Sequence, residues 1–369
     1  MEGPAEVIDL LYTEVEDELR AGVRAMLSDR SPARRVLARV EGDEPYDPTV
    51  WRALGAEMGL AGLAVPESRG GAGASWREVA VVCEELGRAV TPAPYLGSAV
   101  IATGVLLALD DPLLAELAGG ARTAALAVPF GTAPGSAARL AAAEDGVVSG
   151  EVRGVADAAT ANVLLVPATD GLYAVEAVHA ARRPVVSLDL TRPLCDVTLD
   201  AAPGRRLAAG ERATAAIEAG LRAGAAMLAS EQLGVAEWCL GSTVDYLKVR
   251  HQFGRPVGSF QAIKHRLADV WVGVTQARAV ARYAAGCLAA GDPDAPIATA
   301  LAQAHCGPVA VTAAEECVQL HGGIGFTWEH PAHLYLKRAK ADAIALGTAD
   351  RHRARLASLV DLPVGAAPH

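Results

Sequence analysis

The sequence contains few aromatic residues, few lysines and no dense run of basic residues. Aromatic residues make up 4% of its 369 residues, and its formal net charge is −10. Because nucleic-acid binding depends on clustered Lys and Arg side chains that neutralise phosphates, this composition argues against a nucleic-acid-binding protein. Ala, Leu, Glu and Arg are abundant instead, and these residues favour α-helices, so we predict a mostly helical chain.

The sequence also lacks the cysteine and histidine spacings of common metal sites. Its six cysteines show no Cys-x-x-Cys pair. Their scatter favours reduced, buried thiols in a cytoplasmic protein. His330 and His333 have no third ligand at a useful spacing, so we predict no metal site.

No export signal or membrane span is evident in the sequence. The N-terminus is acidic and amphipathic, and it lacks the basic start and apolar core of a signal peptide. The most apolar segment, 95–109, contains glycines and ends in Asp110-Asp111. We therefore predict a buried helix there, and no membrane partner.

Hydrophobic periodicity divides the chain into three parts. Residues 1–120 carry apolar residues at steps of three and four, and Ser75 with Glu78 forms a capping box before one helical run. Residues 121–208 contain short β-rich runs separated by Gly, Pro and Asp, which predict a small sheet. Residues 209–369 contain four helical runs, at 211–250, 260–290, 297–319 and 331–359, the last interrupted near Gly347.

We therefore predict an α+β fold that is mostly α. It would consist of an N-terminal helical domain (1–120), a middle β domain (121–208) and a C-terminal four-helix bundle (209–369). Within the β domain, Thr191-Arg192-Pro193 is expected to join two strands.

Three ordered stretches of the sequence resemble a known family. The most specific is Arg-His-Gln-Phe-Gly-Arg-Pro-Val-Gly-Ser-Phe-Gln at 250–261. The others are Gln-Leu-His-Gly-Gly-Ile-Gly-Phe-Thr at 319–327 and Gly-Leu-Ala-Gly-Leu-Ala-Val-Pro-Glu at 59–67. Together they resemble the acyl-CoA dehydrogenase family, flavoenzymes that introduce a double bond between Cα and Cβ of acyl-CoA thioesters. The resemblance implies FAD as cofactor and an electron-transfer flavoprotein as electron acceptor.

The resemblance also implies that one subunit binds the adenosine-diphosphate half of the FAD of its neighbour. Arg250 ends a long predicted helix, where a guanidinium can bind a pyrophosphate through two charge-assisted hydrogen bonds. Glycines in the second stretch would let the backbone approach the cofactor closely. The positions that match cofactor-binding residues of the family are Arg250, Gln252, Phe253, Gln261, Gln319, Gly322, Gly323 and Thr348.

The carboxylate that the family uses as its base is missing. The reaction needs a base at Cα, and in the family it most often stands directly before a Gly-Thr pair near the C-terminus. Here that position is Leu346. A second family location, on the long helix before Arg250, corresponds to Gly224. Neither residue can accept a proton, so we predict no catalytic residue in this chain.

The stretches of the sheet that would contact a flavin also depart from the family. Ala125-Leu126-Ala127-Val128-Pro129 stands where the family has a stretch resembling Ala-Leu-Thr-Glu-Pro. Residues 150–158 contain neither the Trp nor the Thr of the family's Trp-Ile-Thr-type strand. Residues for a flavin in the chain's own site are therefore absent, whereas residues for the far end of a neighbour's FAD are present.

This asymmetry predicts a non-catalytic subunit, resembling those of heteromeric actinobacterial acyl-CoA dehydrogenases, many of which act on steroid side chains. We expect a heterotetramer in which a catalytic subunit supplies the base and binds the acyl-CoA.

Two alternatives stay open. One is a self-sufficient FAD-dependent dehydrogenase, acting on acyl-CoA or carrier-bound acyl groups, with Glu231 or Asp350 as an unusual base; Glu218 is less favoured. The other is a non-enzymatic scaffold that binds acyl-CoA and no FAD.

Overall fold

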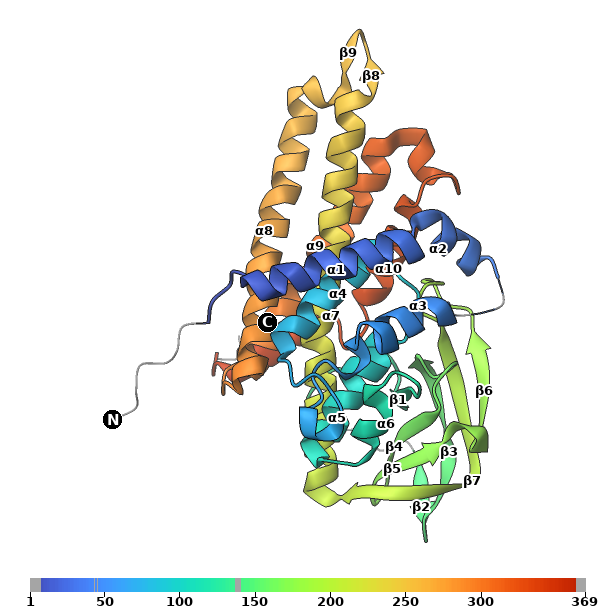
Figure 1. Cartoon of the computed structure of the whole chain (residues 1–369). Coiled ribbons are helices and arrows are strands. Elements are labelled where there is room, and N and C mark those ends of the chain that lie inside the picture. Colours follow the sequence, from blue (N-terminus) through green and yellow to red (C-terminus); the bar gives the residue numbers. More distant parts are fainter. Residues whose placement is uncertain (1–7, 43, 45, 137–140, 363–369) are drawn as a thin grey trace, which may run out of the picture.

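Helices precede and follow one sheet region along the chain, and the fold is the mostly helical α+β fold that the sequence predicts (Figure 1). The computed structural model describes residues 8–42, 44, 46–136 and 141–362. The N-terminal helices are α1 (Glu14–Arg30), α2 (Ala33–Val40), α3 (Pro48–Arg52), α4 (Trp76–Ala89), α5 (Thr103–Leu109) and α6 (Leu113–Ala118). The C-terminal helices are α7 (Gly210–Val249), α8 (Gln261–Ala290), α9 (Ala295–His321), α10 (Ala332–Asp342) and α11 (Ala349–Leu359).

The strands of the main sheet lie between these two groups of helices. They are β1 (Ala124–Leu126), β2 (Ala142–Glu144), β3 (Val147–Ala156), β4 (Val163–Ala168), β5 (Gly171–Glu176), β6 (Ala180–Val185) and β7 (Leu194–Ala209). Their order is β1-β4-β5-β7-β3-β2, with β6 also paired to β7. The β1–β4 pair is parallel and the other pairs are antiparallel. A separate hairpin, β8 (His251–Gln252) and β9 (Arg255–Pro256), joins α7 to α8.

The local sequence signals account for several helix boundaries. The Ser75–Glu78 capping box is present at the start of α4, as predicted, with Ser75 N donating to Glu78 Oε2 at 2.9 Å. The segment 95–109 is a buried helix, as predicted, with a π-helical first part, η4 (Tyr95–Ala102). The last predicted run is broken between α10 and α11, where Leu346 and Gly347 have φ angles of 51° and 104°.

The predicted turn at 191–193 is too short. The connection between β6 and β7 runs from residue 186 to residue 193. Its polar residues Asp189, Thr191 and Arg192 are buried against the helices instead of facing solvent, which explains why this segment does not continue either strand.

One helical stretch, Ala295–Phe326, is long and apolar enough to cross a membrane by length and composition, a feature that the sequence-based predictions do not include. Its most apolar window is 61% buried inside the protein. Its main helix, α9, packs against α7, α8, α10 and α11. The apolar composition is therefore accounted for by a core helix.

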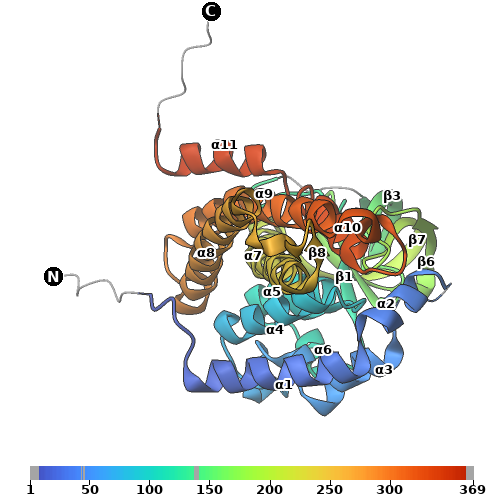
Figure 2. The ribbon, with the colours of Figure 1, turned by 90° about the horizontal axis from the view of Figure 1, so that it is seen from above.

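The long helix α7 lies at the centre of the helical part, between α4 and α9 (Figures 1 and 2). One core cluster of buried apolar residues includes side chains from both the N-terminal and the C-terminal helices. The two groups of helices therefore share a core, and the boundaries at 120 and 208 stay a prediction.

Two glycines allow α4 and α7 to approach closely. A Cβ atom at Gly87 would lie 2.1 Å from Glu231 O, and one at Gly234 would lie 1.9 Å from Glu84 O. Each helix thus contributes a glycine opposite a backbone carbonyl of the other, and no larger residue fits at either position without a shift of the backbone.

We predict that Gly234→Ala lowers the free energy of unfolding by about 1–3 kcal/mol, because its methyl group forces α4 and α7 apart. The matched control is Gly241→Ala on the same helix, where an added Cβ meets no atom within 4 Å. Since Ala is the better helix former, the control should be neutral or stabilising by up to about 1 kcal/mol. Urea unfolding measures both variants, and equal effects would contradict the close-packing argument.

Candidate functional site

The predicted residues of the first motif lie at a projecting end of the molecule, where the β8–β9 hairpin joins α7 to α8 (Figure 1). Arg250 is the C-cap residue of α7. Arg250, Gln252, Phe253 and Gln261 are all exposed. The ring of Phe253 is 92% exposed, although aromatic residues are normally buried. The residues of this motif are therefore exposed at the projecting end of the molecule.

The second motif lies beside the first. Gly322 caps the end of α9 with a φ angle of 63°, a backbone conformation that favours glycine. Gln319, Gly322 and Gly323 are exposed. The ring of Tyr246, one helical turn before Arg250, stacks on that of His321 with centroids 4.5 Å apart. The structure therefore brings the end of α7 next to the end of α9.

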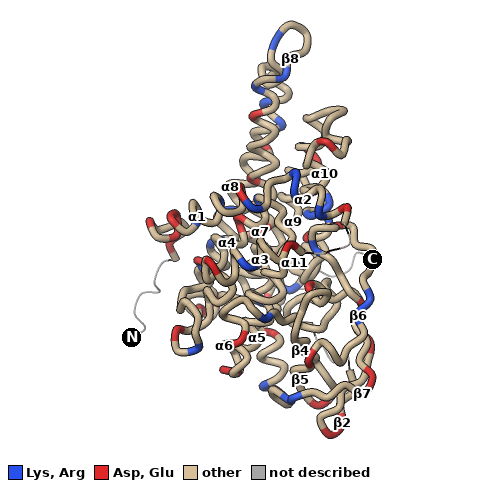
Figure 3. Tube along the Cα trace, turned by 45° about the vertical axis from the view of Figure 1, so that its right-hand side comes forward, with Lys and Arg blue, Asp and Glu red and all other residues tan. Residues whose placement is uncertain are grey.

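The projecting end is basic although the whole chain is acidic. Figure 3 shows basic residues around β8. Among the described residues, the Arg250 guanidinium has no hydrogen bond or ion pair, whereas the nearby Arg266 pairs with Glu316. An exposed guanidinium beside exposed glycines fits a pyrophosphate, which takes charge-assisted hydrogen bonds from Arg and close backbone approach.

Thr348 belongs to a different part of the surface. It is the N-cap residue of α11, and its side chain accepts a hydrogen bond from Arg351 N. The neighbouring Gly347 lies against the sheet segment, where an added Cβ would be 2.6 Å from Ala133 Cβ. The structure thus gives Thr348 a capping role beside the sheet, away from the β8–β9 hairpin.

The two positions where a base would be expected face each other in an apolar contact. Leu346 and Gly224 are both buried. A Cβ atom at Gly224 would lie 3.1 Å from Leu346 Cδ1 and 2.6 Å from Ile101 Cγ1. The space between the two positions is therefore filled by Leu346 and Ile101, and no carboxylate fits there without displacing them.

The segments that would surround a flavin in the chain's own site touch one another directly. Phe130 N donates to Gly154 O at 3.0 Å, and Leu346 N donates to Phe130 O at 2.7 Å. His352 Nε2 lies 2.9 Å from Leu346 O, which fixes the left-handed backbone of Leu346 from its other side. We call the Phe130 backbone with its two hydrogen bonds the Phe130 bridge. It joins the sheet to the loop before α11, so these two segments leave no gap at Phe130 itself.

The other carboxylates considered as bases are engaged elsewhere. The side chain of Asp350 is 92% exposed and pairs with Arg353 at 2.7 Å. Glu218 accepts a hydrogen bond from Gly135 N at 2.5 Å and pairs with Arg222 at 3.1 Å. Both oxygens of Glu218 are thus in use.

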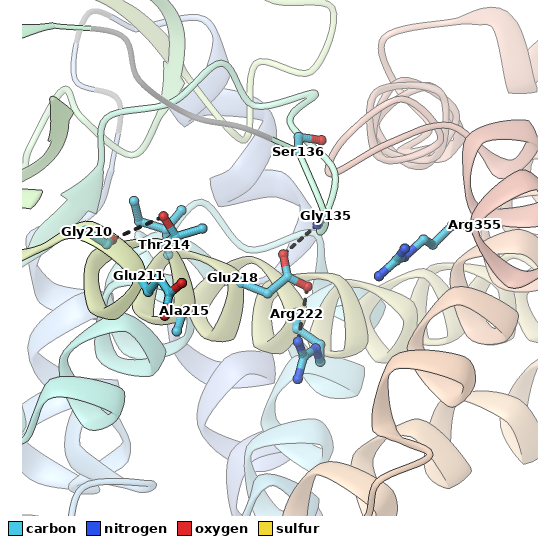
Figure 4. Close-up of a pocket in the computed structure, with 10 residues that line it drawn as sticks. Gly135, Ser136, Gly210, Glu211, Thr214, Ala215, Glu218, Arg222 and Arg355 are labelled. Carbon is cyan, nitrogen blue, oxygen red and sulfur yellow. Dashed lines mark hydrogen bonds and ion pairs between the residues drawn. The ribbon is translucent and has the colours of Figure 1, made fainter. Parts of the chain in front are cut away.

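Glu218 lines a pocket of about 910 Å³ between the start of α7, the sheet segment at Gly135 and α11 (Figure 4). Arg355 points into this pocket from α11. The lining residues are Gly135, Ser136, Gly210, Glu211, Thr214, Ala215, Ile217, Glu218, Arg222 and Arg355, and neither Leu346 nor Gly224 is among them. The pocket therefore does not open onto the expected base positions.

Five buried charged side chains form the most unusual feature of the structure, and we call them the junction cluster. They are Asp189 and Arg192 from the β6–β7 connection, Glu231 from α7, and Arg338 and Asp342 from α10. Arg192 donates to both oxygens of Glu231 at 2.7 and 2.6 Å and to Asp342 Oδ1 at 2.7 Å. Arg338 pairs with Asp189 and Glu231 and donates to Thr191 Oγ1 at 2.5 Å. The cluster thus connects the sheet to two helices.

Glu231 is held in its ionised form by this cluster. Burial alone would raise the pKa of Glu231, but the guanidiniums of Arg192 and Arg338 overcome burial and keep that pKa below its usual range. The pKa of Asp189 is lowered in the same way, chiefly by Arg338. A carboxylate between two guanidiniums is a poor proton acceptor, which argues against Glu231 as a base.

Asp342 titrates differently because three carboxyl groups share two guanidiniums. Burial raises the pKa of Asp342 to about 8, since the attraction of Arg192 is offset by the repulsion of Glu231. Asp342 Oδ2 has no hydrogen-bond partner among the described residues. A protonated Asp342 leaves two positive and two negative charges in the cluster, which balances its buried charge.

The cysteines and histidines show no metal-type arrangement. All six cysteines are free and buried. Within the described ranges, no group of three or more His, Cys, Asp or Glu side chains could hold a metal ion. His330 Nδ1 accepts a hydrogen bond from Ala332 N at 3.3 Å, and the ring of His333 packs edge-on against Trp328.

Comparison with known proteins agrees with the sequence motifs. Residues 13–109 match the model of the acyl-CoA dehydrogenase N-terminal domain, and residues 213–360 match that of the acyl-CoA dehydrogenase C-terminal domain. The chain is 37% identical to acyl-CoA dehydrogenase IpdE2 of Mycobacterium tuberculosis, over 89% of this chain and 92% of that protein.

Two solved structures of named pairs of chains are similar over nearly the whole length. A chain of the ChsE4-ChsE5 complex from Mycobacterium tuberculosis is 27% identical, with a TM-score of 0.85, over 96% of this chain and 100% of its own. A chain of a variant of the Tcur3481-Tcur3483 steroid ACAD is 32% identical, with a TM-score of 0.83, over 94% of this chain and 98% of its own.

We predict that Asp342→Asn changes how stability depends on pH. Because the pKa of Asp342 in the folded chain is about 8, above its unfolded value, this residue stabilises the fold at low pH and loses that contribution as the pH rises towards 8. Asn does not titrate. The free energy of unfolding of Asp342→Asn relative to the unsubstituted chain should therefore increase from pH 5 to pH 8, by up to about 1.4 kcal/mol per pH unit.

Urea unfolding at several pH values measures this difference, with the exposed Asp350→Asn as control. A difference between Asp342→Asn and the unsubstituted chain that stays constant from pH 5 to pH 8 would show that Asp342 is already ionised in the folded cluster.

Proposed function

This chain belongs to the acyl-CoA dehydrogenase family, and we propose that it is a subunit without a catalytic base that completes the FAD site of an unlike partner subunit. The observation that carries the proposal is an asymmetry between its two cofactor-related regions. The projecting end offers Arg250, which is exposed and has no partner among the described residues, beside the exposed Gly322 and Gly323. The expected base positions, Leu346 and Gly224, are closed by apolar packing.

The exposed apolar side chains at the projecting end support an oligomer. They come from α7 to η7 (Gly322–Phe326) and the residues just beyond it, and most are more than half exposed: Val249, Phe253, Trp271, Val272, Ile324, Phe326 and Trp328. Large exposed apolar groups of this kind mark protein–protein interfaces. A partner that covers this end would also meet Arg250.

The partner is proposed to be an unlike chain. In a pair of identical copies, Arg250 of each copy would meet a partner whose own flavin position is closed by the Phe130 bridge, so neither copy would hold a flavin ring. A catalytic subunit with an open position and a carboxylate base would use Arg250, and the pairs named in the similar solved structures agree with this arrangement. We propose a heterotetramer of two such pairs.

In this complex the chain's own residues bind and orient the adenosine-diphosphate half of the cofactor. Arg250, Gln252, Phe253 and Gln261 would act from the hairpin side, and Gln319, Gly322 and Gly323 from the end of α9. Bound FAD supplies the hydride acceptor for desaturation between Cα and Cβ of an acyl-CoA, and the partner supplies the base. An electron-transfer flavoprotein is proposed as the electron acceptor.

The proposed substrate is an acyl-CoA of lipid catabolism. One similar structure is named a steroid ACAD, which favours a steroid side chain or another lipid acyl group carried as a CoA thioester. We propose that the complex acts in the cytoplasm, where the six free cysteines of this chain would stay reduced.

The alternatives have less support. A self-sufficient enzyme would need a base at Cα, but Glu231 is paired with two guanidiniums and Asp350 is exposed at the start of α11. A scaffold without FAD leaves the exposed Arg250 guanidinium and the exposed glycines beside it without a role.

We predict that Arg250→Ala removes FAD from the complex with its catalytic partner while the complex still assembles. The experiment co-expresses this chain with an acyl-CoA dehydrogenase-like chain encoded beside it and measures flavin absorbance per purified complex. Loss of a charge-assisted pyrophosphate contact costs about 1.5–3 kcal/mol, so the dissociation constant for FAD should rise by roughly 10- to 150-fold.

Arg153→Ala is the matched control, because it removes an exposed arginine of the sheet that pairs with Glu151 of the same strand. The control should keep its flavin. If Arg250→Ala retains FAD as firmly as the control does, the proposal that this chain completes the partner's site is wrong.

A further inference from the structure

The sheet and the loop before α11 are in direct contact at Phe130. The Phe130 bridge hydrogen-bonds to Gly154 and to Leu346 at 3.0 and 2.7 Å. The Arg192 guanidinium of the junction cluster, from the β6–β7 connection, lies 5.5 Å from the centre of the Phe130 ring. Backbone, aromatic ring and guanidinium therefore form one continuous contact.

The junction cluster is buried to an extent that is unusual for charged groups. Arg192, Glu231, Arg338, Asp189 and Asp342 each expose less than a tenth of their surface. Buried charges are tolerated only when they are paired and hydrogen-bonded, and Arg192 and Arg338 each contact two carboxylates. The arrangement is therefore specific and cannot be rearranged by small shifts of exposed side chains.

A further buried carboxylate, outside the junction cluster, attaches the sheet to the N-terminal part of the chain. Asp157, which follows β3, accepts hydrogen bonds from the Tyr46 hydroxyl and from Gly97 N, the latter at 2.7 Å. An added Cβ at Gly97 would lie 2.4 Å from Asp157 Oδ2, so the backbone approaches this carboxylate closely. Polar contacts thus attach the sheet to both groups of helices.

We infer that the junction cluster and the Phe130 bridge hold the sheet in place in this chain without a cofactor of its own. They join the sheet to the helices and close the chain's own flavin position. The inference deepens the proposed function and rests on it, because a subunit that serves only its partner's FAD needs another means of holding its sheet in place. A carboxylate restored at Leu346 would therefore find no flavin beside it.

The first test compares the isolated chain with and without a large molar excess of FAD. A ligand that binds only the folded chain raises its melting temperature. We expect no change in melting temperature, and no change in amide hydrogen exchange in residues 125–136, 150–158 and 344–348. A rise in melting temperature with protection of these three segments would overturn the inference, because it would place a flavin at the junction.

The second test removes one member of the cluster. Arg192→Ala leaves Glu231 and Asp342 without their shared guanidinium, so amide exchange in β6, β7 and the connection between them should become at least about tenfold faster. Arg192→Lys, which keeps the positive charge but cannot contact both carboxylates in the same way, should show a smaller effect in the same segments and covers the case in which the alanine variant does not fold. Arg153→Ala on the same sheet is the control.

Unchanged amide hydrogen exchange in β6, β7 and their connection in both Arg192 variants would contradict the inference that the junction cluster holds the sheet in place. The two proposals fail separately. If the chain's own flavin position is open, the isolated chain will bind FAD. If the chain does not contribute to its partner's FAD site, the complex will retain FAD in the Arg250→Ala variant.

Discussion

Two buried guanidiniums shared among three buried carboxyl groups hold the sheet of this protein against its helices. Arg192 connects the β6–β7 connection to α7 and α10, and Arg338 connects α10 back to the same connection. Removing Arg338 would leave Asp189 as a buried carboxylate without a guanidinium, a change that costs about 3–5 kcal/mol in comparable proteins. The position of the sheet, the proposed closure of the chain's own flavin position beside Phe130, and the exclusion of Glu231 as a base all depend on this one set of ion pairs.

The two cofactor-related regions of the chain differ because they face different surroundings. The end of α7 and the end of α9 present a guanidinium without a partner among the described residues, exposed glycines and exposed aromatic rings. Large exposed apolar groups mark interaction surfaces. The region around Leu346 is filled by Ile101, Ala133 and the Phe130 backbone, and it needs nothing further to be stable. In the proposed function a partner completes the first region, whereas the second region needs no partner.

Much of the fold could be predicted from the sequence because its signals are local. Capping residues, apolar periodicity and the glycine break at 347 gave the helices to within a few residues, and β-rich runs gave most of the strands. The junction cluster could not be predicted, since Arg192 and Asp342 stand 150 residues apart and no spacing rule links them. The sequence therefore leaves Glu231 open as a base, and its two guanidinium partners in the structure argue against that role. The site residues of the hairpin rest on the family resemblance of their motif.

Native mass spectrometry of the purified complex with an unlike acyl-CoA dehydrogenase-like chain tests the central claim most directly, because it counts chains and FAD molecules in the same particle. A chain that completes its partner's site while its own position is closed predicts one FAD for every two unlike chains, and none on the isolated chain. One FAD for every chain, or a flavin-loaded homo-oligomer of this chain alone, would contradict the account.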